Sequence, residues 1–208
     1  MSAAARSQQA VLEGLRAQIR ELEARPARRE GALASGRAAV DSLLGGGFPR
    51  GALSEIAGGP ASGKTALALS TVAAAGGASA WVDGRAELYP PAARALGVDL
   101  ARLLIFRPGG RDEVAALWAS EALLASGAFA VVVMDLSLAR GPVAGRRGAS
   151  PDAMLRRLRA AAEQGGTVGL WLAPPLGAPR VPAAVRLEVA EGGKRVGLVR
   201  GGGDGRAA

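Results

Sequence analysis

Apolar runs alternate with amphipathic segments along most of this chain. The runs that read as strands cover residues 52–57, 79–83, 103–106, 129–135 and 167–172. The segments that read as helices lie between them, at residues 64–75, 90–96, 112–126 and 151–164. Such alternation is typical of βαβ units. We therefore expect an α/β fold, in which a mostly parallel, twisted sheet carries helices on both faces.

Two further patterns refine this picture. Residues 129–134 are apolar without polar alternation, as in a strand that is buried on both faces of a sheet. Residues 184–190 and 194–199 predict a C-terminal β-hairpin that turns at residues 191–193. Before the first core strand, we expect residues 41–51 to form a tight glycine-rich connection.

The two ends of the chain differ from its centre. Residues 5–24 predict an amphipathic helix, whose apolar stripe consists of Leu12, Leu15, Ile19 and Leu22. This stripe is our candidate for contact with a protein partner, and packing on its own core is the alternative. Residues 201–208 are glycine-rich, and we expect a disordered tail there. The chain thus divides into an N-terminal helix (1–30), a core (31–200) and a tail (201–208).

Composition excludes several kinds of chemistry. The 208 residues include no cysteine and no histidine, so disulfides, thiolate catalysis, zinc clusters and imidazole bases are excluded. The lack of cysteine also suits a reducing cytosol, and we expect a cytoplasmic protein. No apolar run approaches the roughly 18 residues of a membrane span, so we expect no membrane partner.

The charge of the chain favours an acidic partner. The net charge is +8, from 26 basic and 18 acidic residues, which is typical of contact with nucleic acid. A genome-wide preference for arginine would explain the choice of arginine over lysine, but not this excess. The loop after residue 135 carries Arg140, Arg146 and Arg147, our candidates for contact with single-stranded DNA or a protein partner. A solvated surface loop is the alternative.

One motif restricts the chemistry more than any other. Residues 58–65 read G-x-x-x-x-G-K-T, the pattern of the phosphate-binding P-loop. In such a loop, backbone N–H groups and the N-terminus of the following helix surround the phosphates of a nucleotide. The expected binding residues are those of the loop and the first helical turn: Gly58, Gly59, Pro60, Ala61, Ser62, Gly63, Lys64, Thr65 and Ala66.

The motif also assigns roles to individual side chains. Lys64 supplies a cation that binds the phosphates and assists catalysis, and Thr65 supplies a hydroxyl for Mg²⁺. Lys64 and Lys194 are the only lysines, and every other basic residue is arginine, so a chance match of a glycine-rich turn is disfavoured. The second metal ligand that we expect is Asp135, which follows the apolar run 131–134. An aspartate that caps the next turn is the alternative.

These motifs resemble those of the RecA-type ATPase core. The likeness rests on residues 40–51, on Glu55-Ile56 with the P-loop, on Trp81-Val82-Asp83, and on residues 95–100 and 124–135. It covers about residues 38 to 200. The resemblance implies a RecA-like P-loop NTPase core that binds ATP with Mg²⁺ between neighbouring subunits, often along DNA. Self-association of this chain is therefore an open alternative.

Three positions depart from that family. Recombinases carry a water-activating glutamate where this chain has Arg85, and Glu87 is the nearest candidate for a displaced catalytic base. The adenine-stacking tyrosine of the family falls at Ala92, and Tyr89 is the candidate that would compensate. The sensor glutamine of the family falls at Pro174, which has no side-chain amide. We therefore expect ATP binding with weak or absent hydrolysis.

This combination resembles the ImuA-type accessory proteins of translesion DNA synthesis. The resemblance implies an ATP-binding accessory protein of DNA damage tolerance and the SOS response, which acts through DNA-repair or polymerase-like protein partners and through RecA. Two alternatives stay open. One is an active DNA-dependent ATPase of recombinase type, with Glu87 as its base. The other is a structural regulator of RecA or of cell division that binds no nucleotide.

Overall fold

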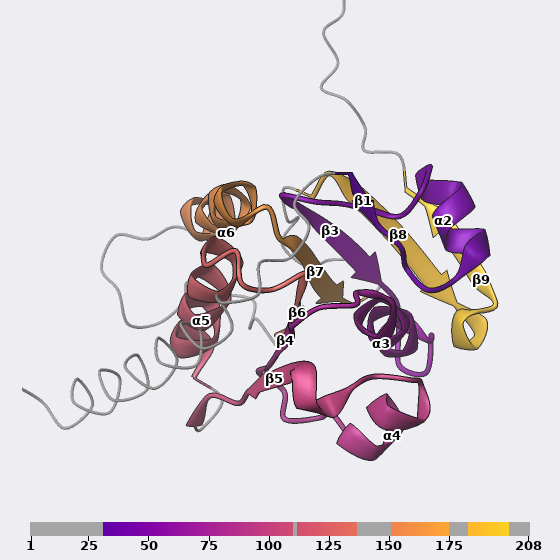
Figure 1. The fold of residues 1–208 in the computed structure, drawn as a ribbon, viewed down its shortest axis with the longest axis horizontal. Helices are drawn as coiled ribbons and strands as arrows, with labels where there is room; N and C mark the ends of the chain where they lie inside the picture. Colours follow the sequence, from indigo (N-terminus) through magenta and orange to yellow (C-terminus); the bar gives the residue numbers. More distant parts are fainter. Residues whose placement is uncertain (1–30, 110–111, 137–150, 175–182, 200–208) are drawn as a thin grey trace, which may run out of the picture.

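The computed structural model describes residues 31–109, 112–136, 151–174 and 183–199 (Figure 1). Its main sheet has seven strands, in the order β5-β4-β6-β7-β3-β8-β9. These strands are β3 (Ala52–Ala57), β4 (Ser79–Asp83), β5 (Leu103–Phe106), β6 (Val131–Asp135), β7 (Val168–Ala173), β8 (Val185–Ala190) and β9 (Arg195–Leu198). Neighbouring strands are parallel, except that β8 and β9 are antiparallel. The predicted α/β fold with a mostly parallel sheet and a C-terminal hairpin is confirmed.

Helices cover both faces of this sheet (Figure 1). On one face lie α5 (Glu113–Ala125) and α6 (Pro151–Gly165), and on the other lie α3 (Lys64–Ala74) and α4 (Pro90–Ala95). Successive side chains of a strand point to opposite faces. Val132 and Met134 of β6 therefore join the core beneath α5 and α6, whereas Val131 and Val133 join the core beneath α3. The strand is buried on both sides, as its apolar run predicts.

The segment before the first core strand differs from the prediction. The expected connection over residues 41–51 was wrong in its first part, which belongs to helix α2 (Ala38–Leu44). After it, strand β2 (Phe48–Pro49) pairs with β1 (Ala32–Leu33) in a separate small sheet. Helix α2 ends at Gly45, whose φ of 70° allows its N–H to bond two carbonyl groups of the last turn. The helix is short and has no capping side chain at its start, so the usual start signal is missing.

The carboxyl ends of the parallel strands meet at one edge of the sheet. In the register of β4 and β6, Asp83 lies beside Asp135. The N–H of Gly58, directly after β3, donates to the carbonyl of Ala173 at the end of β7 (3.0 Å). Open α/β sheets bind their ligands at this edge.

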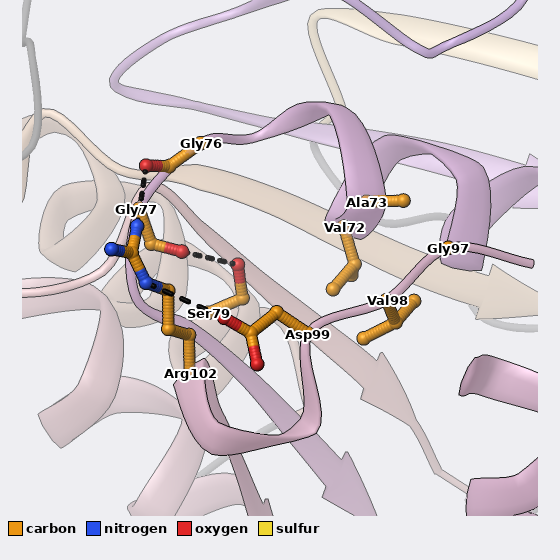
Figure 2. Close-up of a pocket in the computed structure, with 9 residues that line it drawn as sticks. All are labelled: Val72, Ala73, Gly76, Gly77, Ser79, Gly97, Val98, Asp99 and Arg102. Atoms are coloured by element: carbon orange, nitrogen blue, oxygen red, sulfur yellow. Dashed lines mark hydrogen bonds and ion pairs between the residues drawn. The ribbon is translucent and has the colours of Figure 1, made fainter.

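A small hollow of about 100 Å³ lies at the opposite end of β4 (Figure 2). Ser79, at the start of the strand, lines it, and so does Arg102, which donates to the carbonyl of Gly76 (3.1 Å) and pairs with Asp99 (3.6 Å). Asp83 lies at the other end of the same strand, and four residues of a strand span about 13 Å. The hollow is therefore separate from the edge that carries the P-loop.

Some predictions fall outside the described residues. These are the N-terminal helix within residues 1–30, the loop arginines Arg140, Arg146 and Arg147, and the tail 201–208. In the part of the chain that the structure describes, no helix is long and apolar enough to cross a membrane.

Candidate functional site

The P-loop lies between the end of β3 and the start of α3. Gly63 caps the helix with a φ of 92°, a left-handed conformation that favours glycine. The ammonium group of Lys64 turns back over the loop and donates to the carbonyl oxygens of Gly58 (3.0 Å) and Gly59 (3.2 Å). Burial lowers the pKa of Lys64, and the nearby charge of Asp135 opposes that shift. The cation is thus held over the loop and faces the end of β6.

Glycine is required at two points of this loop. A Cβ atom at Gly58 would lie 2.4 Å from the Ser62 hydroxyl. A Cβ atom at Gly63 would lie 2.4 Å from the backbone nitrogen of Gly193, in the hairpin turn η3 (Glu191–Gly193). The turn between β8 and β9 therefore packs directly against the P-loop, a contact that no local sequence pattern indicates.

The start of α3 offers backbone donors to an anion. An α-helix leaves its first N–H groups without acceptors inside the helix. Across the described ranges, the N–H groups of Thr65 and Ala66 also have no acceptor elsewhere. Together with the helix dipole and the ammonium of Lys64, these donors suit a phosphate group.

Asp135 is the acidic residue whose charge acts most strongly on Lys64. It ends β6 and is only 7% exposed. Burial raises its pKa to about 6; Arg85 opposes this shift, Asp83 and Glu87 add to it, and Lys64 opposes it. The carboxylate of Asp135 is therefore partly desolvated and surrounded by other charged side chains, an environment that is typical of functional sites.

The oxygen donors at this edge fit a magnesium ion that arrives with a nucleotide. Mg²⁺ takes one or two carboxylates and completes its shell with phosphates and water. Asp135 and the exposed Thr65 supply donors of this kind. The described residues include no cluster of three His, Cys, Asp or Glu side chains that could bind a metal alone, so phosphates and water would have to provide the remaining ligands.

A buried carboxylate organises the segment after β4. The side chain of Asp83 is fully buried and pairs with Arg107 (Nε–Oδ2 2.8 Å). Its Oδ1 accepts hydrogen bonds from the N–H groups of Glu87 (3.0 Å) and Leu88 (3.3 Å). The segment turns sharply, and Ala86 has a φ of 57°. Sequence reasoning missed the roles of Asp83 and Arg107, because only the pairing of β4 with β5 brings them together.

This turn holds Arg85 between two carboxylates. Arg85 donates to Glu87 through Nε (2.9 Å) and Nη2 (3.0 Å). Its Nε also lies 3.8 Å from Oδ1 of Asp135. The carboxylate of Glu87, the candidate displaced base, is thus bound to a guanidinium group.

The remaining predicted positions lie near the same edge or just beyond it. Tyr89 precedes α4 and is 66% exposed, so its ring is open to stacking by a ligand. Ala92 lies within α4. Pro174 directly follows β7 and is exposed. The structure thus brings together the P-loop, Asp135, Arg85 and Glu87.

Comparison with known proteins shows the family of this chain. A family model described as the RecA N-terminal domain matches residues 14–161. Protein RecA of Corynebacterium jeikeium is 38% identical over 156 residues, which cover 68% of this chain and 41% of that protein. Protein RecA of Chlorobaculum parvum is 42% identical over 128 residues, which cover 60% of this chain and 36% of that protein. The matches thus span less than half the length of these curated relatives.

A solved structure extends the likeness to the fold. The crystal structure of the RadB recombinase superposes with a TM-score of 0.62 and 25% identity, over 75% of this chain and 82% of that one. It shares the α/β architecture with a mostly parallel sheet. From the family model, the RecA sequences and this common fold, the chain belongs to the RecA family.

Proposed function

We propose that this chain is a RecA-like accessory protein of DNA damage tolerance, which binds ATP with Mg²⁺ and hydrolyses it weakly or not at all. The observation that carries the proposal is a contrast within one site. The P-loop has its glycines, its free N–H groups and its lysine, whereas the side chain beside Asp135 is the guanidinium of Arg85.

Hydrolysis needs a group that positions and deprotonates water. Loss of a positioned general base slows a reaction by about 10²–10⁴-fold. Glu87 is the candidate displaced base, and both of its carboxylate oxygens accept hydrogen bonds from Arg85. Pro174 has no side-chain amide that could bind a phosphate in place of the sensor glutamine of the family. These features favour binding over turnover.

Each part of the site has a proposed task. The loop N–H groups and Lys64 would hold the phosphates, and Thr65 and Asp135 would hold Mg²⁺. When bound, Mg²⁺ would neutralise part of the phosphate charge. Tyr89, exposed before α4, would stack on the base.

The proposal extends to partners. We place the protein in the cytoplasm, in translesion synthesis during the SOS response, with DNA-repair or polymerase-like proteins and RecA as partners. The net charge of +8 supports contact with DNA or with an acidic protein surface. Direct contact with single-stranded DNA through Arg140, Arg146 and Arg147, and self-association, belong to the same proposal.

ATP binding and turnover by the full chain test this function. We expect magnesium-dependent ATP binding in titration calorimetry, its loss in Lys64→Ala, and turnover near background with or without single-stranded DNA. Arg159→Ala is the control, since Arg159 is an exposed cation of α6, on the other face of the sheet. Brisk, DNA-stimulated turnover that Lys64→Ala abolishes would overturn the proposal. Absence of binding at millimolar ATP would instead support a regulator that uses no nucleotide.

One observation favours a second candidate, an active DNA-dependent ATPase with Glu87 as base. Burial lowers the pKa of Lys64 and the charge of Glu87 offsets a small part of that shift, so this carboxylate lies within electrostatic reach of the phosphate-binding cation. In that case Glu87→Gln would eliminate turnover while ATP binding survives. In the accessory protein the same substitution would leave the background turnover unchanged.

A further inference from the structure

Three charged side chains form a cluster at the mouth of the P-loop. Arg85 makes two hydrogen bonds to Glu87 and approaches Asp135 to 3.8 Å. The exposed fractions of these side chains are 40% for Arg85, 58% for Glu87 and 11% for Asp135. The guanidinium therefore lies between an exposed carboxylate and a buried one.

The backbone beneath Arg85 is fixed. The N–H of Gly84 donates to the carbonyl of Asp135 (3.0 Å), which ties the turn to the end of β6. A Cβ atom at Gly84 would lie 3.0 Å from the side chain of Leu136, so the two segments touch. On the other side, the buried carboxylate of Asp83 holds the N–H groups of Glu87 and Leu88. Motion of the guanidinium is therefore a rotation of its own side chain.

The cluster also faces the phosphate-binding cation. After burial, the influences on the pKa of Lys64 are Asp135, Arg85 and Glu87, in that order. Arg85 lowers this pKa because it is a like charge within electrostatic reach. Two cations thus border the same space, one fixed over the loop and one held by carboxylates.

We propose that Arg85 is the residue by which this site distinguishes a nucleoside triphosphate from a diphosphate, because it leaves Glu87 and binds the terminal phosphate. The proposal rests on the proposed ATP binding and names the specificity determinant of that site. An exposed arginine–glutamate pair contributes little to stability, so its loss is easily offset. A guanidinium binds two phosphate oxygens at once, through parallel charge-assisted hydrogen bonds.

The exchange also changes the surroundings of Asp135. When Arg85 moves to the phosphate, it stays beside Asp135 and supplies positive charge to both groups. Arg85 then neutralises part of the negative charge that a divalent cation would otherwise neutralise. We therefore expect triphosphate binding to depend less on Mg²⁺ in the unchanged chain than in a variant without Arg85.

Equilibrium binding of ATP and ADP to the full chain, each with Mg²⁺ and with chelator, tests the proposal. Arg85→Ala should weaken ATP binding by about tenfold or more, as for a lost charged hydrogen bond, and ADP binding by less than about twofold. The loss for ATP should be larger in chelator. Arg85→Lys, which keeps the charge but not the fork, should fall between. Arg159→Ala is the control, because Arg159 lies on α6, on the other face of the sheet, and is exposed.

A second variant is expected to act in the opposite direction. Glu87→Gln removes the carboxylate that competes for Arg85, so ATP should bind more tightly while ADP is unaffected. Equal losses for ATP and ADP in Arg85→Ala, or no loss, would overturn this inference and leave the proposed function standing. If the unchanged chain binds neither nucleotide, the proposed function fails and this inference fails with it. Circular dichroism of each variant checks that it is folded.

Discussion

At the scale of single residues, Asp135 lies where its charge is disfavoured. Burial raises its pKa to about 6, from an ordinary value of 3.8. Between these two values the folded protein holds a proton that the unfolded chain has released. The free energy of unfolding therefore falls as the pH rises through this window. Above pH 6 the folded protein bears the full cost of the buried negative charge.

Asp135→Asn should remove this cost in the nucleotide-free protein. We expect the variant to be more stable than the unchanged chain at pH 7.5 by about 1–3 kcal/mol, since each pKa unit corresponds to about 1.4 kcal/mol. The gain should shrink as the pH falls from 6 towards 4. Urea unfolding at a series of pH values measures the difference. A variant that is less stable at pH 7.5 would contradict the desolvation of Asp135.

The individual site residues were predictable to different degrees. Lys64 and Asp135 follow from the P-loop motif and from an apolar run that ends in an acid. The pairing of Arg85 with Glu87 does not, because it depends on a left-handed Ala86 and on hydrogen bonds to Asp83. Such a turn is set by tertiary contacts, which a local pattern does not contain.

At the scale of elements, the segment between β4 and α4 is held from one side by β5. Arg107, directly after β5, pairs with Asp83 and donates to the carbonyl of Leu88 (2.7 Å). Arg102, directly before β5, makes comparable contacts with Gly76 and Asp99 at the other end of that strand. The difference is that the carboxylate of Asp83 is fully buried, whereas that of Asp99 is 63% exposed.

Arg107→Met should destabilise the fold more than Arg102→Met. The first change leaves a buried carboxylate without its cation, and we expect a loss of about 1–3 kcal/mol. The second removes an exposed pair, and we expect less than about 0.5 kcal/mol. Urea unfolding compares the two, and hydrogen exchange at Glu87 and Leu88 should accelerate only in Arg107→Met. Similar losses in both variants would show that the buried pair does not hold this turn.

The elements themselves were largely predictable. The parallel strands from β3 to β7 and the helices from α3 to α6 follow from apolar periodicity, with boundaries within two residues. Helix α2 was not predicted, because its first residue follows Arg37, whose side chain makes no capping hydrogen bond, and because glycines follow its end. Its stability comes from burial of Val40 in the core, which depends on the rest of the fold.

At the scale of the whole molecule, the order of strands mixes early and late parts of the chain. Strand β3 lies between β7 and β8, which follow it by more than half of the sequence. A partly buried ion pair reinforces this arrangement, because Arg186 of β8 contacts Glu55 of β3 (2.6 Å). The first and second halves therefore share one sheet and cannot form separate cores.

This topology predicts unfolding in a single cooperative step. Trp81 of β4 and Trp171 of β7 are both buried, on strands from different halves of the chain. Their fluorescence and the far-ultraviolet circular dichroism should follow one urea transition with a common midpoint. Two separated midpoints would contradict the prediction, because they would mean that part of the sheet survives alone.

The contact between Gly63 and the turn of the C-terminal hairpin has a consequence for biosynthesis. A ribosome finishes the P-loop long before it adds Gly192 and Gly193, against which that loop rests. For most of that interval β3 also lacks both of its neighbours, β7 and β8, because they begin only at Val168 and Val185. The nascent polypeptide should therefore acquire a packed P-loop only late in translation, and until then its hydrophobic strands are open to chaperones.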